Sequence, residues 1–182
     1  MELMEPLYSR KSLFRAGLSA LLGPRETFAP AAPRWLRPPG ALAERAFLRA
    51  CTRCDDCLRA CPHLVIRKAG PETGAAAGTP VIIPHENPCL MCLDLPCIES
   101  CGAGALVSGG RPGIGLATVA AARCYMAAGQ PCDYCVIECP ETPLAIAVNP
   151  GEPARVDTER CTGCGKCAQI CPADAITIRD QR

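Results

Sequence analysis

Four short apolar runs recur along the chain, each a few residues after a group of cysteines. They occupy residues 65–66, 105–107, 145–148 and 175–178. A short apolar run bounded by turn residues is typical of a short strand, because helices usually need a longer segment. We therefore expect four short strands in equivalent places, and a fold built from copies of one small unit.

Two longer segments, 41–50 and 116–123, lead into cysteine groups and are rich in apolar residues and Ala. We expect a short helix in each of them. The other expected elements are strands at 81–83 and 154–156, a turn at 149–153 and a flexible Gly- and Ala-rich loop at 69–80.

The sixteen cysteines form four groups of four, and none is left over. The first and fourth groups have the spacing C-x2-C-x2-C-x3-C-P, which is the bacterial ferredoxin run for a [4Fe–4S] cluster. The second group has a longer middle gap and is followed by Gly102, and the third has seven residues in its first gap. The groups are Cys51, Cys54, Cys57 and Cys61; Cys89, Cys92, Cys97 and Cys101; Cys124, Cys132, Cys135 and Cys139; and Cys161, Cys164, Cys167 and Cys171.

This spacing suits an iron–sulfur cube, because three thiolates two residues apart wrap one face of the cube along a tight loop. In the fourth group Gly163 and Gly165 allow a close approach and positive φ angles. We therefore predict that all sixteen cysteines are ligands of four [4Fe–4S] clusters. Disulfides and structural zinc are the alternatives. They are less favoured, because closely spaced Cys pairs suit disulfides poorly and zinc sites rarely use three Cys followed by Pro in this way.

The fourth Cys of each run is expected to bind a different cluster from the first three, as in two-cluster ferredoxins. About twenty residues separate the third and fourth groups, which favours pairing of groups in sequential order. Cys171 would then join the first three cysteines of group three, and Cys101 those of group one. A nested arrangement, with group one paired to group four, stays open.

Aromatic residues make up only 4% of the chain, so clusters would have to supply much of its interior, and we expect the cluster-free chain to fold poorly. Residues 1–50 carry eight basic and four acidic side chains, whereas residues 51–182 carry eleven basic and fourteen acidic. The basic residues near the N-terminus alternate with Pro and Ala rather than with stacking aromatics, so a nucleic-acid partner is not expected.

Residues 9–15 resemble a twin-arginine export signal in which Lys11 replaces the second Arg. The apolar stretch that follows, 16–22, is too short for a membrane helix, and no transmembrane segment is expected. We predict a cytoplasmic protein with an N-terminal docking arm. Export to the periplasm through a variant twin-arginine signal is the alternative.

The motifs together resemble the ferredoxin-type proteins of the NapF, NapG and MauM group, which serve periplasmic nitrate reduction and methylamine utilisation. Similar stretches are residues 36–42 with 51–54, residues 88–97 with 104–106, and the long gap from Cys124 to Cys132. The resemblance implies a carrier that exchanges electrons with redox partners, either a reductase catalytic subunit or a membrane quinol-oxidising protein. The NapF branch implies the alternative, a cytoplasmic maturation factor for a molybdenum-containing reductase.

The sequence therefore predicts an α+β fold of two tandem ferredoxin-like halves, each with two [4Fe–4S] clusters. The expected division is a basic, largely irregular arm with a Pro-rich linker at 1–40, a first half at 41–112 and a second half at 113–182, with the Gly-rich residues 108–115 at the boundary. No constellation of catalytic acid, base or nucleophile is present in the sequence, so we expect an electron-transfer or accessory protein and not an enzyme.

Overall fold

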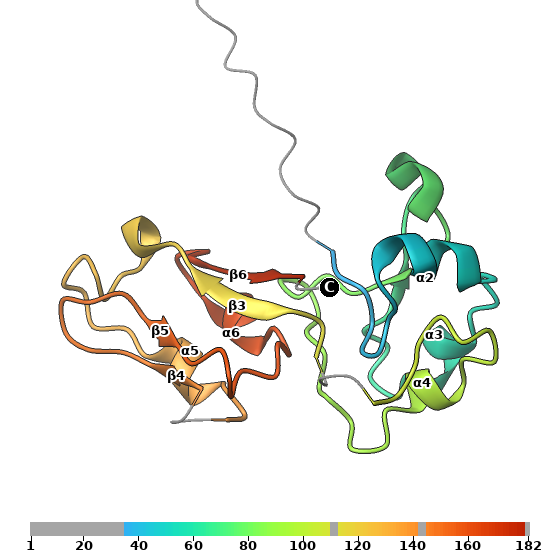
Figure 1. The fold of residues 1–182 in the computed structure, drawn as a ribbon. Coiled ribbons are helices and arrows are strands. Elements are labelled where there is room, and N and C mark those ends of the chain that lie inside the picture. The colour runs from blue at the N-terminus through green and yellow to red at the C-terminus, as the bar shows by residue number, and fades with distance from the viewer. Residues whose placement is uncertain (1–34, 110–112, 142–144, 181–182) are drawn as a thin grey trace, which may run out of the picture. The chain divides into compact units, whose positions relative to one another are not determined.

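The computed structural model describes residues 35–109, 113–141 and 145–180, which belong to one compact unit (Figure 1). The export-like motif at 9–15 and the apolar stretch at 16–22 lie outside the described residues.

The elements are short and mixed, with helices of four to seven residues among strands of two to four. Up to residue 109 they are α2 (Glu44–Ala50), α3 (Asp56–Ala60), β1 (Arg67–Lys68), the 3₁₀ segment η1 (Pro71–Ala76), β2 (Pro80–Val81) and α4 (Pro96–Glu99). From residue 113 onward they are β3 (Leu116–Val119), the 3₁₀ segment η2 (Ala121–Arg123), α5 (Tyr134–Ile137), β4 (Ile146–Ala147), β5 (Arg155–Val156), α6 (Lys166–Ile170) and β6 (Ile176–Arg179).

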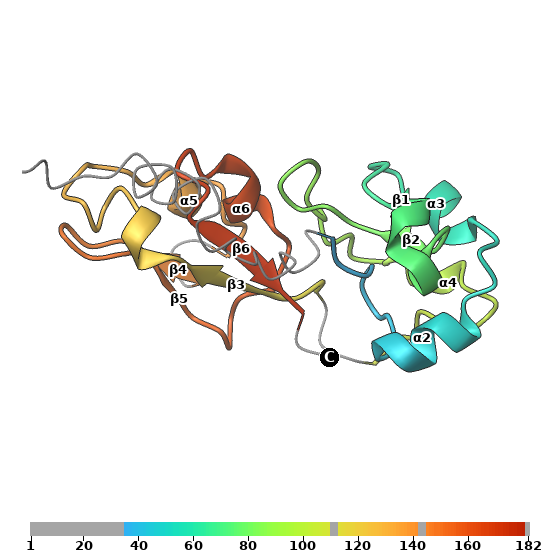
Figure 2. The same cartoon turned by 90° about the horizontal axis from the view of Figure 1, so that it is seen from above.

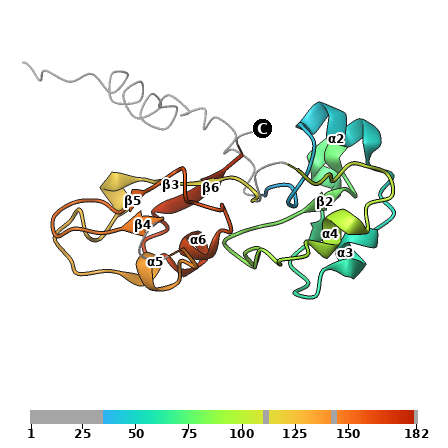
Figure 3. The same ribbon diagram turned by 60° about the horizontal axis from the view of Figure 1, so that its bottom comes forward.

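The described strands form three antiparallel pairs, β1 with β2, β3 with β6, and β4 with β5. Figure 2 shows β3 alongside β6, and this pair has the longest register, with Leu116 opposite Arg179 and Val119 opposite Ile176. Helix α3 packs against α4, and α5 packs against α6 (Figure 3). The same pairing of two short helices thus occurs once in residues 35–109 and once in residues 113–180.

The buried apolar residues gather in two clusters, and cysteine thiols belong to both. The first cluster lies between Leu36 and Ile114 and is centred on Phe47 and Ile82, both with no exposed surface. The second lies between Ala117 and Ile176. The cysteines therefore supply core surface in a chain that has few aromatic residues.

Several expected elements are confirmed. The helix expected at 41–50 is present as α2, although it begins at Glu44. The strands expected at 145–148 and 154–156 are the hairpin β4–β5, and the strand expected at 175–178 is β6. The strand expected at 105–107 is not formed, since this run makes a single bridge, from Leu106 to Ala41, and the strand expected at 65–66 is displaced to β1, which begins just after it.

A further expectation is wrong. Residues 116–123 form β3 and η2 instead of a helix, because Leu116–Val119 pairs along its whole length with β6, and this tertiary pairing outweighs the helical preference of the Ala-rich segment. The loop expected at 69–80 contains the 3₁₀ segment η1, and the Arg53 side chain donates hydrogen bonds to the carbonyl oxygens of Ala75 and Ala77 within this loop.

Candidate iron–sulfur sites

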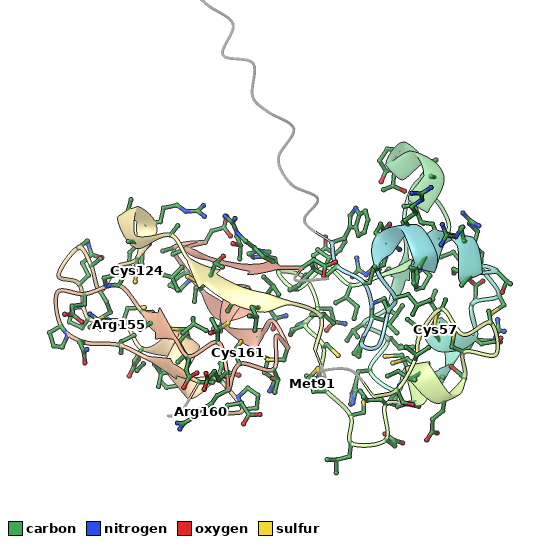
Figure 4. The ribbon with its side chains drawn as sticks, viewed as in Figure 1. Cys57, Met91, Cys124, Arg155, Arg160 and Cys161 are labelled. Carbon is green, nitrogen blue, oxygen red and sulfur yellow. The ribbon has the colours of Figure 1, made fainter. Side chains whose placement is uncertain are left out.

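The structure gathers the sixteen thiols into four sets, each made from two of the sequence groups. Quartet A is Cys51, Cys54, Cys57 and Cys101; quartet B is Cys61, Cys89, Cys92 and Cys97; quartet C is Cys139, Cys161, Cys164 and Cys167; quartet D is Cys124, Cys132, Cys135 and Cys171. Figure 4 labels Cys57 of quartet A, Cys161 of quartet C and Cys124 of quartet D.

Quartets A, B and C each line a hollow of similar empty volume, about 360, 330 and 340 Å³ including the space at its mouth. The remaining walls are mostly apolar, with Phe47 and Leu106 in A, Ile66 and Ile82 in B, and Ile146 and Ile178 in C. In quartet D the three other thiols lie near enough to Cys135 to raise its pKa by repulsion. Because quartets A to C line hollows of similar size with four thiol donors each, we infer that they bind the same kind of group.

In every quartet three thiols come from one run and the fourth comes from its neighbour in the sequence. Cys101 reaches the first run and Cys61 reaches the second, while Cys171 reaches the third and Cys139 the fourth. This is the sequential arrangement of the groups. The nested arrangement is not the one that the structure adopts.

Two left-handed backbone positions shape each of three ligand loops. In the fourth run they are Gly163 (φ 68°) and Gly165 (φ 92°), as the sequence predicts. The equivalent residues of the first run, Arg53 (φ 60°) and Asp55 (φ 67°), adopt the same conformation although they are not glycines. L-residues are uncommon there, and such strain persists where the surrounding structure imposes it, frequently at functional sites.

The second run repeats this pattern at Met91 (φ 51°) and Leu95 (φ 43°). Sequence reasoning missed these four non-glycine positions, and the signal that would have revealed them is their alignment with Gly163 and Gly165 in the repeat. Alternating turn conformations of this kind aim backbone N–H groups into a concave, anion-binding surface. The loops are therefore shaped to face negatively charged sulfur.

Backbone N–H groups also meet the crossing thiols. The N–H of Leu106 donates to Cys101 Sγ and the N–H of Ala175 donates to Cys171 Sγ, each at 3.3 Å. Both donors lie in the apolar runs that follow their cysteine groups. These runs thus supply a hydrogen bond to a thiol as well as apolar packing, and hydrogen bonds to sulfur are one means of tuning a cluster's potential.

Burial makes ionisation of the thiols unfavourable without a positive partner. It raises the pKa of Cys57 to about 12 and those of Cys89, Cys97 and Cys135 to about 11, and in each case nearby thiols raise it further by repulsion. The pKa values of Cys164 and Cys167 are raised for the same two reasons. Four thiolates can share such a hollow only around bound cations, and soft thiolates select iron–sulfur clusters and zinc.

The spacing of the thiols within a quartet distinguishes an iron–sulfur cluster from a single zinc ion. Within the described ranges, no three His, Cys, Asp or Glu side chains converge closely enough to hold a single metal ion. In each of quartets A to C the four thiols instead line one common hollow. The residues present therefore fit a multi-atom cluster.

A buried arginine supports the wall of quartet A. Arg37 is only 1% exposed; it donates two hydrogen bonds to the Glu44 carboxylate (2.9 and 2.6 Å), one to Thr79 Oγ1 (2.6 Å) and one to the Pro80 carbonyl (2.9 Å). Its guanidinium also lies over the ring of Phe47 at 4.4 Å from the centroid. Because Phe47 and Pro80 both line the hollow of quartet A, Arg37 fixes two parts of that wall from behind.

The comparisons with known proteins agree with this chemistry. Residues 154–177 match the family model of the 4Fe-4S binding domain. The chain is 36% identical over 180 residues to the ferredoxin-type protein NapG of Escherichia coli (strain K12), covering 90% of this chain and 78% of that protein. It is 39% identical over 173 residues to the methylamine utilization ferredoxin-type protein MauM of Methylobacillus flagellatus, covering 88% and 73%.

A more distant relative is the ferredoxin-type protein NapF of Escherichia coli (strain K12), at 29% identity over 147 residues, covering 78% of this chain and 83% of that protein. No solved structure matches.

The fold, the thiol quartets and the matched domain define a ferredoxin-type iron–sulfur protein, an electron-transfer protein rather than an enzyme. Within that class, the chain belongs to the family of the NapG and MauM ferredoxin-type proteins. In the described part of the chain, no helix has the length and apolar character needed to cross a membrane.

Proposed function

We propose that the chain carries electrons one at a time by means of four [4Fe–4S] clusters, one held by each of quartets A to D. The observation that carries the proposal is the distribution of the thiols: four sets of four, each with crossed ligands and none left over. When bound, each cluster supplies a centre that gains or loses one electron. Quartets A and B would then make up a dicluster half at 41–112, and quartets C and D a second at 113–182.

The protein's own residues would control each cluster through burial and backbone hydrogen bonds. Apolar walls such as Ile82 in quartet B and Ile146 in quartet C keep water from much of the site. The loop and strand N–H groups, among them those of Leu106 and Ala175, stabilise the negative charge on sulfur. Both effects set the reduction potential of a cluster without any catalytic side chain.

The relatives favour the NapG branch over the NapF branch, because NapG is 36% identical to the chain and NapF 29% identical. The proposed system is therefore a respiratory reductase of the periplasmic nitrate reductase type. The proposed partners are a reductase catalytic subunit and a membrane quinol-oxidising protein, with no nucleic acid. A cytoplasmic location stays our prediction, with export as the alternative. The alternative function, maturation of a molybdenum reductase, predicts capture of a cluster-containing chain by the apo catalytic subunit.

Metal analysis of anaerobically purified protein tests the proposal. We expect about sixteen iron and sixteen acid-labile sulfide per chain, and uptake of about four electrons on reductive titration. An iron content near twelve would show that one quartet is not a cluster site, and quartet D, with its long gap after Cys124, would be examined first. Zinc without sulfide would overturn the proposal.

A further inference from the structure

The ligand loops of quartets B and C are in direct contact. The backbone N–H of Cys89, in quartet B, donates a hydrogen bond to the carbonyl oxygen of Cys164, in quartet C, at 2.9 Å. Both cysteines are buried, and each lines its own hollow. Between these two thiols lie only the two residues themselves and one hydrogen bond.

Several neighbouring contacts hold this junction together. The Gln169 side chain donates to the Glu86 carbonyl oxygen at 3.0 Å, and His85 Nδ1 lies 3.4 Å from a carboxylate oxygen of Asp174. Pro84 packs so tightly on Gly165 that a Cβ added at Gly165 would lie 2.7 Å from the Pro84 Cβ. The contact between Cys89 and Cys164 is thus one of a set of contacts and not an isolated approach.

The other quartets are linked within their own part of the chain. Quartets A and B share the packed helices α3 and α4, because Cys57 of A lies in α3 and Cys97 of B lies in α4. Quartets C and D share α5 and α6 in the same way, through Cys135 of D and Cys167 of C. The contacts therefore join the four quartets in the order A, B, C, D.

We propose that electrons cross between the two halves at the Cys89–Cys164 junction, which places quartets B and C in the middle of the chain of sites and quartets A and D at its ends. The inference rests on the proposed function, because it requires a cluster in each quartet. The transfer moves one electron from one site to the next and makes or breaks no bond. Electron transfer becomes steeply slower with distance, so this direct hydrogen-bonded connection between quartets B and C is the expected route.

Magnetic coupling between neighbouring reduced clusters tests the order, and electron paramagnetic resonance reads it. In the fully reduced protein, Cys161→Ala with Cys164→Ala removes the site of quartet C. We expect iron to fall by about four per chain and the quartet D signal to become that of an isolated cluster. Removal of quartet D by Cys124→Ala with Cys132→Ala should instead leave the quartet C signal coupled to quartet B. A quartet D signal that stays coupled to the first half without quartet C would overturn the order.

A milder variant keeps every ligand in place. Gln169→Ala removes the side-chain hydrogen bond to the Glu86 carbonyl oxygen at the junction, whereas Asn149→Ala is a matched control that removes an exposed amide bonded to Glu152 in the turn between β4 and β5. We expect Gln169→Ala to weaken the coupling between B and C and to keep the coupling between C and D, with the iron content unchanged. Wild-type coupling in this variant would contradict the junction. If the protein holds four reducible clusters but shows no coupling between the halves, the proposed electron route is wrong and the proposed function stands. If it holds fewer than four clusters, the proposed function itself is wrong.

Discussion

Replacing Arg37 with Met is expected to destabilise the first hydrophobic cluster and the wall of quartet A. The change removes the hydrogen bond to the buried Pro80 carbonyl, and an orphaned buried acceptor costs about 1–3 kcal/mol. It also removes a desolvated guanidinium–ring contact with Phe47, which contributes about 2 kcal/mol. Removal of the buried positive charge of Arg37 favours the folded state and offsets part of this loss. The Glu44 carboxylate, whose side chain is 45% exposed, is then hydrated by solvent. The net expected loss is about 3 kcal/mol, at the lower end for breaking a buried ion pair.

The assay is the rate of cluster loss in denaturant under anaerobic conditions, followed by the decay of visible absorbance. A rate is the right measure, because release of a cluster makes unfolding irreversible. A loss of 3 kcal/mol corresponds to an increase in rate of about a hundredfold when the contacts are broken in the transition state. Arg37→Lys should recover little, because an ammonium group cannot reproduce the guanidinium's paired donors.

Arg155→Met is the matched control, since the Arg155 side chain is 70% exposed and pairs with Glu152 at the surface. Such a pair contributes about 0–0.5 kcal/mol, so the rate should change by less than about threefold. If Arg37→Met also falls within that range, the buried arginine does not support the wall and the reasoning is refuted.

Two further predictions concern pH and location. In the reduced, cluster-free chain the folded state holds Cys57, Cys89 and Cys97 at pKa values of about 11–12, above the ordinary thiol value of 9.0, so the unfolded chain ionises first. Any residual helical circular dichroism should therefore persist below pH 9 and decline between pH 9 and about 12, whereas the cluster-loaded protein should not change. A signal that rises with pH would contradict this sign. Changing Arg10 and Lys11 to Gln should weaken partner capture and leave cell fractionation unchanged, and an exported protein whose export is lost in this variant would refute the cytoplasmic prediction.

The sequence was most informative where chemistry depends on local spacing. The runs around Cys51 and Cys161 place three thiols on one short loop, and the left-handed turns at Gly163 and Gly165 follow from the same local geometry. Spacing does not determine where the fourth thiol of each run goes, because that depends on which helices pack together. The packing of α3 on α4 and of α5 on α6 decides this, so both arrangements stayed open before the structure was known.

Long-range partners account for the rest. Leu116–Val119 pairs with β6, whose residues follow about sixty positions later, and a local reading of an Ala-rich segment cannot detect that partner. From the sequence alone Arg37 would be placed at the surface, because it lies in a Pro-rich stretch. Its buried partner Thr79 lies 42 residues away and cannot be recognised from the local sequence. The strained turns at Met91 and Leu95 were hidden by side chains that seldom adopt positive φ.

Crossed ligation is the central claim, and single Cys→Ser variants test it most directly. The electron paramagnetic resonance spectrum of the reduced protein should show the same altered cluster in Cys171→Ser and in Cys135→Ser, because both thiols belong to quartet D. Cys164→Ser should alter a different cluster, that of quartet C. If Cys171→Ser instead matches Cys164→Ser, each run binds its own cluster; if it matches Cys54→Ser, the groups are nested. Either result contradicts the account.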